Sequence, residues 1–527
     1  MPHLIPLLIR NTAERLGERP ALAYGEATLD YATLWQSVET AARGFLELDI
    51  GPRDRIAVYL PKQIETIVAL FGASHAGAAF VPVNPALKAR QVGHILRDCN
   101  VRILVTSADR LASLADEVGQ CHDLRNIVIV GDPPSPGVNT VSWQQVMELG
   151  AASARTGHRA IDSDMAAILY TSGSTGLPKG VVLSHRNMVA GAKSVASYLN
   201  NTPEDRLLAV LPLSFDYGFS QLTTGFLVGA SVRLMNYLLP RDIPRAVARH
   251  RITGLACVPP LWIQLAELDW PAEAQASLRY ITSTGGRMPD PLVKKLKSLL
   301  PTSEIYLMYG LTEAFRSTFL PPDEIDARPN SIGKAVPNAE ILVVRPDGRP
   351  CGVNEPGELV HRGVLVGMGY WNDPKRTAER YKPAPGQDPA LPIQEMAVWS
   401  GDTVKMDEDG YLYFVGRRDE MIKTSGFRVS PVEVEEIIYA SGKVGEVAAI
   451  GVDHPALGQA IIVVVTAPEG AALDKDTVLA HCRKEMPSYM VPAEIVEWQS
   501  LPRNPNGKVD RKLISSELGN PLKDAAE

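Results

Sequence analysis

Residues 170–180 read YTSGSTGLPKG and follow an apolar run, AAILYTS (166–172), that is typical of a buried strand. Glycines let the backbone approach a ligand closely, because they lack a Cβ atom. Successive amides and hydroxyls can donate to phosphate oxygens, and Lys179 adds a positive charge. The stretch therefore predicts a phosphate-binding loop at the end of a strand.

Two other interpretations of this loop are less favourable. A P-loop NTPase requires G-x-x-x-x-G-K-[ST], but Pro178 precedes the lysine and Gly180 follows it, so that pattern fails. A plain surface loop would use its serines and threonines only as solvated residues. The density of glycine, hydroxyl and lysine residues favours a ligand-binding loop.

On both sides of this loop, helical patterns alternate with short β-branched runs. DRIAVYLP (54–61) predicts a strand, IETIVALFGASHAG (64–77) a helix, and VRILVTS (101–107) a further strand. Strand–helix alternation indicates βαβ units and parallel sheets. Near residue 340, short strands with Asp-Gly turns suggest an antiparallel, barrel-like region.

After this region, Ser430 is expected to cap a helix that has Pro431 at its first position. The rest of the chain predicts strand, strand, helix and strand in that order. We expect an α/β protein with a large N-terminal domain of βαβ-type sheets plus a small barrel-like region, residues 1–418. A small C-terminal α/β domain follows at residues 419–527.

Composition narrows the function further. The chain has 527 residues, enough for several domains, and its 45% hydrophobic and 21% charged content is ordinary for a soluble globular protein. A net charge of −7 argues against a nucleic-acid partner. The five cysteines are scattered without a CxxC pair, so neither a disulfide framework nor a zinc site is expected, and a cytoplasmic location fits best.

Two apolar stretches could be mistaken for targeting or membrane segments. MPHLIPLLIRNTAERLG (1–17) lacks a basic n-region and a cleavage site, so it predicts an amphipathic helix rather than a signal peptide. The longest apolar stretch, residues 66–85, is interrupted by Ser74, His75, glycines and prolines. It predicts helix, turn and strand, and no membrane span.

The loop at 170–180 resembles the phosphate loop of the AMP-forming adenylate-forming enzymes: acyl-CoA synthetases, luciferases and nonribosomal-peptide adenylation domains. Further stretches similar to motifs of this family follow its order along nearly the whole chain. They are AGAAFVPVNP (76–85), YGLTE (309–313), GELVHRGVLVGMGYWNDPKRTAERY (357–381), WSGDTV (399–404), GRRDEMIKTSGFRVSP (416–431) and NPNGKVDRK (504–512). One such motif would be weak, but six in order make the resemblance specific.

The resemblance implies an ATP site whose residues fall into three groups. The phosphates would contact Thr171, Ser172, Ser174, Thr175 and Lys179. The adenine would lie along Gly285, Gly286 and Arg287 and stack on Tyr309. The ribose would bind Asp402, with Arg417 donating to ribose or phosphate. For Asp402 and Arg417, a structural ion pair in a turn-rich region is the alternative.

For the chemistry itself, the resemblance implies three residues. Thr312 would contact the α-phosphate, Glu313 would help to hold Mg²⁺, which prefers oxygen ligands, and Lys508 would contact the α-phosphate and the reacting carboxylate. Without the resemblance, Glu313 reads as a surface acid and Lys508 as one exposed lysine. The small domain is expected to rotate at Asp419 and to exchange the Lys508 loop for the loop around Gly426 between two half-reactions.

The acid to be activated is expected to lie at LPLSFDYGFSQL (211–222). Its Phe215-Asp216 pair resembles the FD of amino-acid adenylation domains, where the aspartate binds the substrate ammonium, and not the Phe-His of many acyl-CoA ligases. A buried carboxylate needs such a partner. The alternative is that Asp216 caps the following helix.

Alignment to the family gives the remaining substrate-binding positions, a set too polar for a long fatty chain. They are Tyr217, Ser220, Cys257, Thr282, Thr284, Met308, Arg316 and Ser317. Arg316 either binds a second carboxylate of the substrate or pairs with Asp216. Such a pairing would remove the case for an amine substrate.

The predicted activity is ATP-dependent activation of a small polar acid, an amino acid in the favoured interpretation, and its transfer to a thiol. Because LISSELGNPLKDAAE (513–527) follows the Lys508 motif directly, we expect a separate acceptor, either the phosphopantetheine of a freestanding carrier protein or coenzyme A. The alternative is an acyl-CoA synthetase for a non-amino acid. A non-catalytic relative is disfavoured because Lys179, Glu313, Asp402 and Lys508 are all present. A luciferase-like oxidation is disfavoured because Ser425 stands where those enzymes resemble one another in having lysine.

Overall fold

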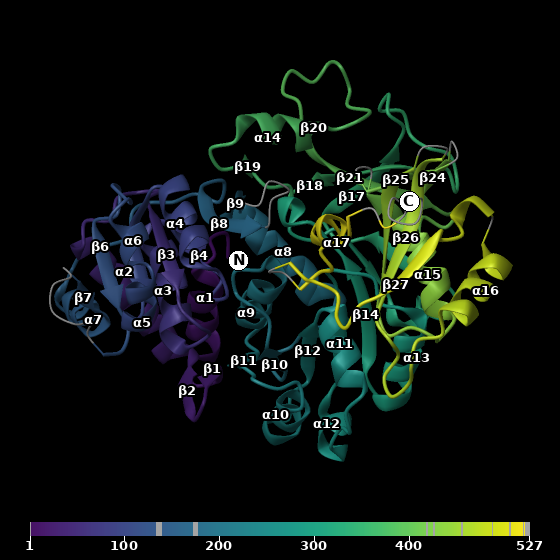
Figure 1. Ribbon diagram of the computed structural model, residues 1–527. Helices are drawn as coiled ribbons and strands as arrows, with labels where there is room; N and C mark the ends of the chain where they lie inside the picture. Colours follow the sequence, from purple (N-terminus) through teal and green to yellow (C-terminus); the bar gives the residue numbers. More distant parts are fainter. Residues whose placement is uncertain are drawn as a thin grey trace.

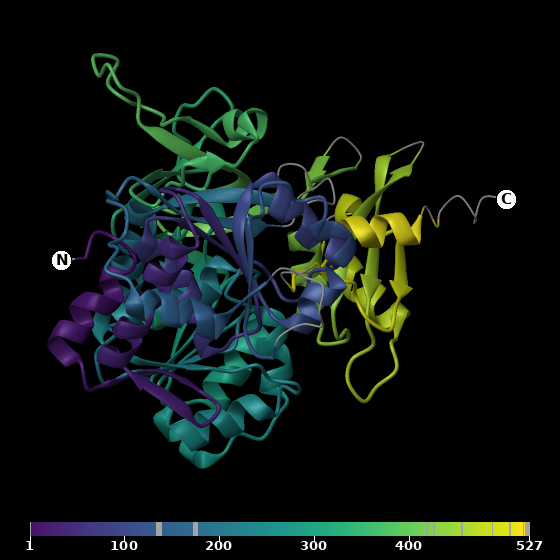
Figure 2. The same ribbon diagram turned by 90° about the vertical axis from the view of Figure 1, so that its left-hand side faces the viewer.

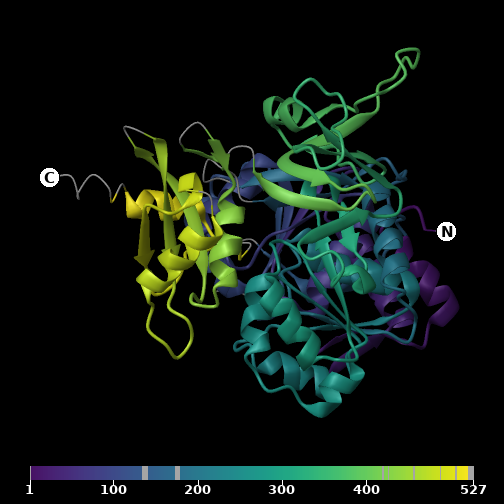
Figure 3. The ribbon, with the colours of Figure 1, turned by 90° about the vertical axis from the view of Figure 1, so that its right-hand side faces the viewer.

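The computed structural model describes residues 2–132, 140–171, 178–417, 420–424, 427–454, 457–486, 488–504, 507–519 and 521. Three β-sheets organise these residues, and helices cover the sheets (Figure 1). Figures 2 and 3 show the elements after residue 420 as a lobe set beside the rest of the chain. The expected α/β class, with a large N-terminal part and a small C-terminal one, is confirmed.

The largest sheet has fourteen strands in the described residues. One half is mainly parallel: β1 (Pro20–Tyr24), β10 (Arg206–Ala209), β11 (Ser231–Leu234), β12 (Gly254–Cys257), β13 (Tyr280–Ser283) and β14 (Glu304–Tyr309), with β2 (Ala27–Asp30) antiparallel at the edge. The other half is antiparallel, as expected for the region near residue 340: β15 (Thr318–Leu320), β16 (Ser331–Ala335), β17 (Ala339–Val344), β18 (Gly357–Gly363), β20 (Tyr381–Pro383), β21 (Met396–Met406) and β22 (Leu412–Arg417).

The second sheet has eight strands in the same part of the chain. Its parallel members are β3 (Arg55–Tyr59), β4 (Ala79–Pro82), β5 (Val101–Thr106), β6 (Asn126–Ile129), β7 (Val141–Ser142) and β8 (Met165–Thr171). Two antiparallel strands complete it, β9 (Lys179–Ser184) and β19 (Gly369–Tyr370). The predicted phosphate loop connects β8 to β9.

The third sheet contains β23 (Ile422–Thr424), β24 (Phe427–Val429), β25 (Val447–His454), β26 (Gly458–Val465) and β27 (Glu494–Glu497). The predicted cap is confirmed, because the Ser430 side chain accepts from the Glu433 amide at the start of α15, with Pro431 at the first helical position. The predicted boundary at Asp419 lies outside the described residues and stays a prediction.

The helices follow the alternation expected from the sequence. Those of the first two sheets are α1 (Leu7–Leu16), α2 (Tyr31–Glu47), α3 (Ile64–Ala76), α4 (Ala89–Asp98), α5 (Ala108–Ser113), α6 (Ala115–Val118), α7 (Trp143–Ala152), α8 (His185–Tyr198), α9 (Asp216–Val228), α10 (Asp242–His250), α11 (Pro259–Ala266), α12 (Ala272–Ser277), α13 (Asp290–Leu299) and α14 (Pro374–Arg380). The C-terminal ones are α15 (Pro431–Ala440), α16 (Lys475–Glu485) and α17 (Arg511–Leu518), and short 3₁₀ turns are η1 (Thr312–Ala314), η2 (Pro322–Glu324) and η3 (Ser488–Met490). No helix among the described residues is long and apolar enough to cross a membrane.

Helix α9 is buried along most of its length and joins the two large sheets. It packs on β10 and β11, while its Phe219 stacks on Phe80 of β4 at 5.0 Å and on Phe71 of α3 at 5.8 Å. Its buried residues include polar ones, Ser220, Gln221, Thr223 and Thr224, as well as apolar ones, so protein surrounds the helix on all sides. The residue at its amino end, Asp216, is therefore held by rigid neighbours.

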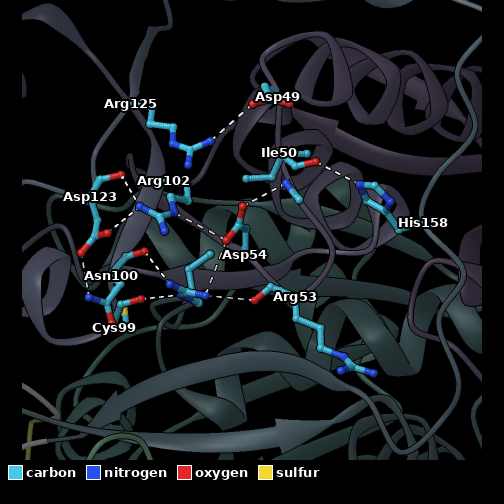
Figure 4. Close-up of polar contacts among 12 residues, drawn as sticks. Asp49, Ile50, Arg53, Asp54, Cys99, Asn100, Arg102, Asp123, Arg125 and His158 are labelled. Atoms are coloured by element: carbon cyan, nitrogen blue, oxygen red, sulfur yellow. Dashed lines mark hydrogen bonds and ion pairs between the residues drawn. The ribbon is translucent and has the colours of Figure 1, made fainter.

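A network of hydrogen bonds and ion pairs lies at the amino-terminal edge of the second sheet (Figure 4). Arg102 at the start of β5 pairs with Asp123 at 2.5 Å, and Asn100 donates to the same carboxylate at 2.7 Å. Asp54, just before β3, accepts from the Gly51 amide at 2.9 Å. Ligands of parallel sheets bind at the carboxyl ends of strands. This network lies at the opposite edge, so its role is structural.

Candidate active site

The predicted site residues gather at the carboxyl ends of parallel strands, where α/β proteins bind ligands. Cys257 ends β12, Thr284 follows β13, and Tyr309 ends β14. Asp216 begins α9, in the connection that leaves β10. Segments that are far apart in the sequence therefore meet at one edge of the sheet.

The phosphate side of the site contains three polar residues in mutual contact. Lys179 Nζ lies 3.3 Å from Glu313 Oε1 and donates to the Tyr370 hydroxyl at 2.9 Å. Tyr370 in turn donates to Glu313 Oε1 at 2.5 Å. Tyr370 belongs to the motif at 357–381, but the sequence assigned it no role. Its hydroxyl holds the predicted metal ligand and the predicted phosphate-binding lysine together.

The electrostatics keep Glu313 ionised. Burial raises the pKa of its carboxyl, but Lys179 and Tyr370 outweigh burial, so the pKa falls below its ordinary value. Groups of three or more His, Cys, Asp or Glu side chains able to hold a metal are absent from the described part of the chain. A single carboxylate beside the phosphate loop fits Mg²⁺, because this ion keeps several waters and also binds substrate phosphates.

In the predicted nucleoside-binding part of the site, Tyr309 and Asp402 are in contact. The Tyr309 hydroxyl donates to Asp402 Oδ2 at 2.5 Å, and Asp402 is only 3% exposed. Gly285 has a φ of +85°, which favours glycine after β13. Asp402 lies opposite Arg417 in the register of β21 and β22, but the Arg417 side chain is not described. The structure thus brings Tyr309, at the end of β14, into contact with Asp402 within β21, although three strands lie between β14 and β21 in the sheet.

Arg287 makes contacts that the sequence did not reveal. It pairs with Glu436 of α15 and donates to Asn330. Burial lowers the pKa of its guanidinium to about 10. The pair with Glu436 connects the C-terminal lobe to the large sheet. A nucleotide contact of Arg287 stays a prediction.

Lys508 reaches the site from the C-terminal lobe. Its Cε lies 3.9 Å from the position that a Cβ on Gly285 would occupy. Its positive charge also acts to lower the pKa of Asp216. The C-terminal lobe is therefore positioned so that this lysine lies beside the predicted acid-binding residues.

Asp216 and Arg316 form a buried ion pair of 2.9 Å, with exposures of 5% and 3%. Burial raises the pKa of Asp216, and the guanidinium opposes that rise. The capping alternative needs correction, because the N-cap of α9 is Phe215 and Asp216 is already helical. Removing either partner of a buried pair costs about 3–5 kcal/mol, so the pair is a strong constraint.

We define the acid-side cluster as Asp216, Tyr217, Thr282, Met308 and Arg316. Its members outside the ion pair are also closely packed. Tyr217 and Thr282 share a hydrogen bond of 2.5 Å, and Tyr198 donates to the Met308 sulfur at 3.0 Å. Cys257 is fully buried, and burial raises the pKa of its thiol well above the ordinary value.

Ser317, another predicted substrate residue, contacts a histidine that the sequence did not single out. His361 Nδ1 lies 3.0 Å from Ser317 Oγ, and Nε2 has no hydrogen-bond partner in the described residues. Burial lowers the pKa of His361 to about 3, so its ring is neutral at physiological pH. If Nδ1 of the neutral ring carries the proton, it donates to Ser317 Oγ. The serine hydroxyl can then donate its own hydrogen to another acceptor.

This buried histidine predicts a pH-dependent stability. Burial also lowers the pKa of His185 to about 4. Between pH 6.5 and the native pKa values, both imidazoles bind protons in the unfolded chain but not in the native one. Their contribution to the free energy of unfolding is therefore complete above pH 6.5 and decreases as the pH falls toward the native pKa values. Each histidine should contribute about 1.4 kcal/mol to the change in the free energy of unfolding between pH 7.5 and 5.5.

Urea unfolding between pH 7.5 and 5.5 measures this change. His361→Gln should reduce the change in the free energy of unfolding over this range by about 1.4 kcal/mol, while exposed His122→Gln should leave it unchanged. A flat profile in the wild-type protein would contradict the expectation.

Some predicted residues remain untested. Ser172, Ser174, Thr175, Asp419 and Gly426 lie outside the described residues. Thr171, at the end of β8, has a buried hydroxyl without a partner in the described part of the chain, and so does Ser220 on α9. Gly286 packs near Pro259, and Thr312 begins η1 beside Glu313.

Known families and curated sequences share this arrangement of motifs. Residues 9–371 match the AMP-binding enzyme model, and residues 433–508 match the AMP-binding enzyme C-terminal domain. The chain is 33% identical to the L-proline--[L-prolyl-carrier protein] ligase of Streptomyces coelicolor, over 96% of this chain and 95% of that protein. It is 29% identical to tyrocidine synthase 3 of Brevibacillus parabrevis over 98% of this chain, but it spans only 8% of that protein.

Among solved structures, ATP-bound MatB from Rhodopseudomonas palustris superposes with a TM-score of 0.86. The match covers 98% of this chain and 99% of that one at 24% identity, and it supports the fold alone. The first family model, in contrast, covers more than half of the chain and includes the phosphate loop, and the second extends to Lys508. The chain belongs to the AMP-binding enzyme family, whose members are AMP-forming ligases that activate acids as adenylates.

Proposed function

We propose that this ligase activates a small polar amino acid as an adenylate and transfers it to the phosphopantetheine thiol of a carrier protein. The observation that carries the proposal is Asp216, a buried carboxylate within the field of Lys508. Asp216 accepts from Arg316. A carboxylate has about four lone-pair sites, so it can also accept a substrate ammonium. The carrier-protein ligase relative supports the choice of acceptor.

The proposed chemistry is mostly positioning and charge neutralisation. The substrate carboxylate attacks the α-phosphorus of ATP, and pyrophosphate leaves. Lys508 would offset the repulsion between the two anions, and Lys179 would bind the departing phosphates. Bound Mg²⁺, held by Glu313, would supply further positive charge at the phosphates. The thiol then attacks the acyl carbon and AMP leaves.

The proposal includes a division of the chain at Asp419. Residues 1–418 would bind ATP and the acid, and residues 419–527 would pivot to replace the Lys508 loop with the loop around Gly426. The arrangement with Lys508 beside Gly285 would be the one for adenylation. Arg287 and Glu436 would help to hold it.

A second candidate is an acyl-CoA synthetase for a non-amino acid. The Asp216–Arg316 pair favours it, because Arg316 already compensates the buried carboxylate without any substrate amine. The two candidates differ in one property, namely whether the substrate ammonium contributes to binding.

Exchange of labelled pyrophosphate into ATP separates them, with amino acids and their des-amino analogues as substrates. Asp216→Asn keeps an oxygen for Arg316 but loses the charge. We expect it to lower kcat/KM for amino acids about 10- to 100-fold more than for des-amino acids, the value of one charged hydrogen bond. Equal exchange with both substrate classes and no effect of the variant would favour the acyl-CoA synthetase.

A further inference from the structure

Arg316 has two hydrogen-bonding edges, and only one of them is used. Its Nη1 donates to Asp216 Oδ2 at 2.9 Å and to the Phe315 carbonyl at 3.0 Å. Its Nε and Nη2 are buried and have no hydrogen-bond partner among the described residues. These two nitrogens form the side edge of the guanidinium plane, which binds both oxygens of a carboxylate at once.

The backbone holds Arg316 firmly in this position. Phe315 has a φ of +53°, a left-handed conformation that a bulky residue rarely adopts. Its ring lies against α8, where a Cβ on Gly191 would be only 2.3 Å from the ring. The Arg316 amide donates to the Ala314 carbonyl at 2.6 Å. Strained backbone of this kind persists where the surrounding packing maintains it, and it concentrates at ligand-binding sites.

We infer that the activated acid carries a second carboxylate, which binds the Nε and Nη2 edge of Arg316. This inference rests on the proposed function, because it concerns the acid of the same site. Arg316 then has both roles that the sequence left open: Nη1 holds Asp216, and the other edge binds the substrate. The substrate class is a dicarboxylic amino acid with its ammonium at Asp216.

Pyrophosphate exchange with matched acids and amides tests the inference in the wild-type chain. The pairs are L-aspartate with L-asparagine and L-glutamate with L-glutamine, which differ in one charge and one acceptor oxygen. We expect at least one of the two acids to exceed its amide about 10- to 50-fold in kcat/KM, mainly through KM. Amides that react as well as the acids would overturn the inference while leaving the proposed function intact.

Arg316→Lys supplies the second readout, because lysine keeps the charge and loses the two-donor edge. It should raise KM for the acid about 10- to 50-fold and reduce the preference for acid over amide. Arg279→Lys is the matched control, since Arg279 pairs with Asp205 at 2.9 Å outside the acid-side cluster. ATP binding measured by calorimetry shows that each variant is folded. An unchanged acid-to-amide ratio in Arg316→Lys would contradict the assigned role.

The des-amino pairs succinate with succinamate and glutarate with glutaramate separate the two proposals. Exchange with the diacids but with no amino acid would overturn the amino-acid function and keep the second-carboxylate inference. No exchange with any of these acids or amides would overturn the inference, and the proposed function would be overturned as well if other small polar amino acids also gave no exchange.

Discussion

Replacement of Lys508 by alanine is expected to lower acid-dependent pyrophosphate exchange by about 10²–10³-fold. The lysine reaches the site from the C-terminal lobe, with its Cε 3.9 Å from the Cβ position of Gly285. There it would stabilise charge that develops as two anions approach, and removal of one such preorganised donor typically has an effect of this size. Thioester formation from a supplied acyl-adenylate should continue, because that half-reaction would use the loop around Gly426 instead.

The two half-reactions should be measured separately on the same preparation. Lys475→Ala, an exposed lysine at the start of α16 in the same lobe, is the matched control and should leave both rates unchanged. An equal loss of both half-reactions in Lys508→Ala would contradict the exchange of loops. Unchanged adenylation would show that the position beside Gly285 has no catalytic role.

Much of the architecture could be predicted because it follows from local patterns. Alternating apolar runs predict the parallel strands, and Ser430 with Pro431 predicts the start of α15, which the structure confirms. The family resemblance also predicts that Lys179, Glu313 and Asp402 belong to one ATP site, although it does not predict which side chains they contact. Such patterns depend on residues that are close together in the sequence. Similar patterns occur wherever the same kind of helix or strand forms, so they can be recognised without the structure.

The partners of the site residues could not be predicted in the same way. Asp216 and Arg316 are 100 residues apart, and Glu313 and Tyr370 are 57 residues apart. No periodicity links such pairs, because packing in three dimensions brings them together. The left-handed Phe315 is a further example, since its ring packing on α8 is a tertiary contact. Sequence reasoning therefore left the role of Arg316 as two alternatives, and the geometry allows both at once.

Replacement of Glu313 by glutamine is expected to have an effect comparable to that of Lys508→Ala, a loss of about 10²–10³-fold in pyrophosphate exchange. Glutamine keeps the shape and an oxygen that can accept from Tyr370 and Lys179, which lie 2.5 Å and 3.3 Å from Oε1 in the native protein. It loses the negative charge. Because Mg²⁺ prefers charged oxygen ligands, the variant should also need a higher Mg²⁺ concentration for half-maximal rate.

Initial exchange rates over a series of Mg²⁺ concentrations measure both effects, with Glu379→Gln on the exposed face of α14 as the matched control. A purely structural Glu313 would lower the rate without changing the Mg²⁺ dependence, because its only task would be to hold Lys179 and Tyr370. Tyr370→Phe distinguishes that case, since it removes one bond to the carboxylate and keeps the charge. If Glu313→Gln shifts the Mg²⁺ requirement and Tyr370→Phe does not, the carboxylate acts on the metal. If neither variant shifts it, the metal must bind elsewhere, and the assignment of Glu313 as its ligand is wrong.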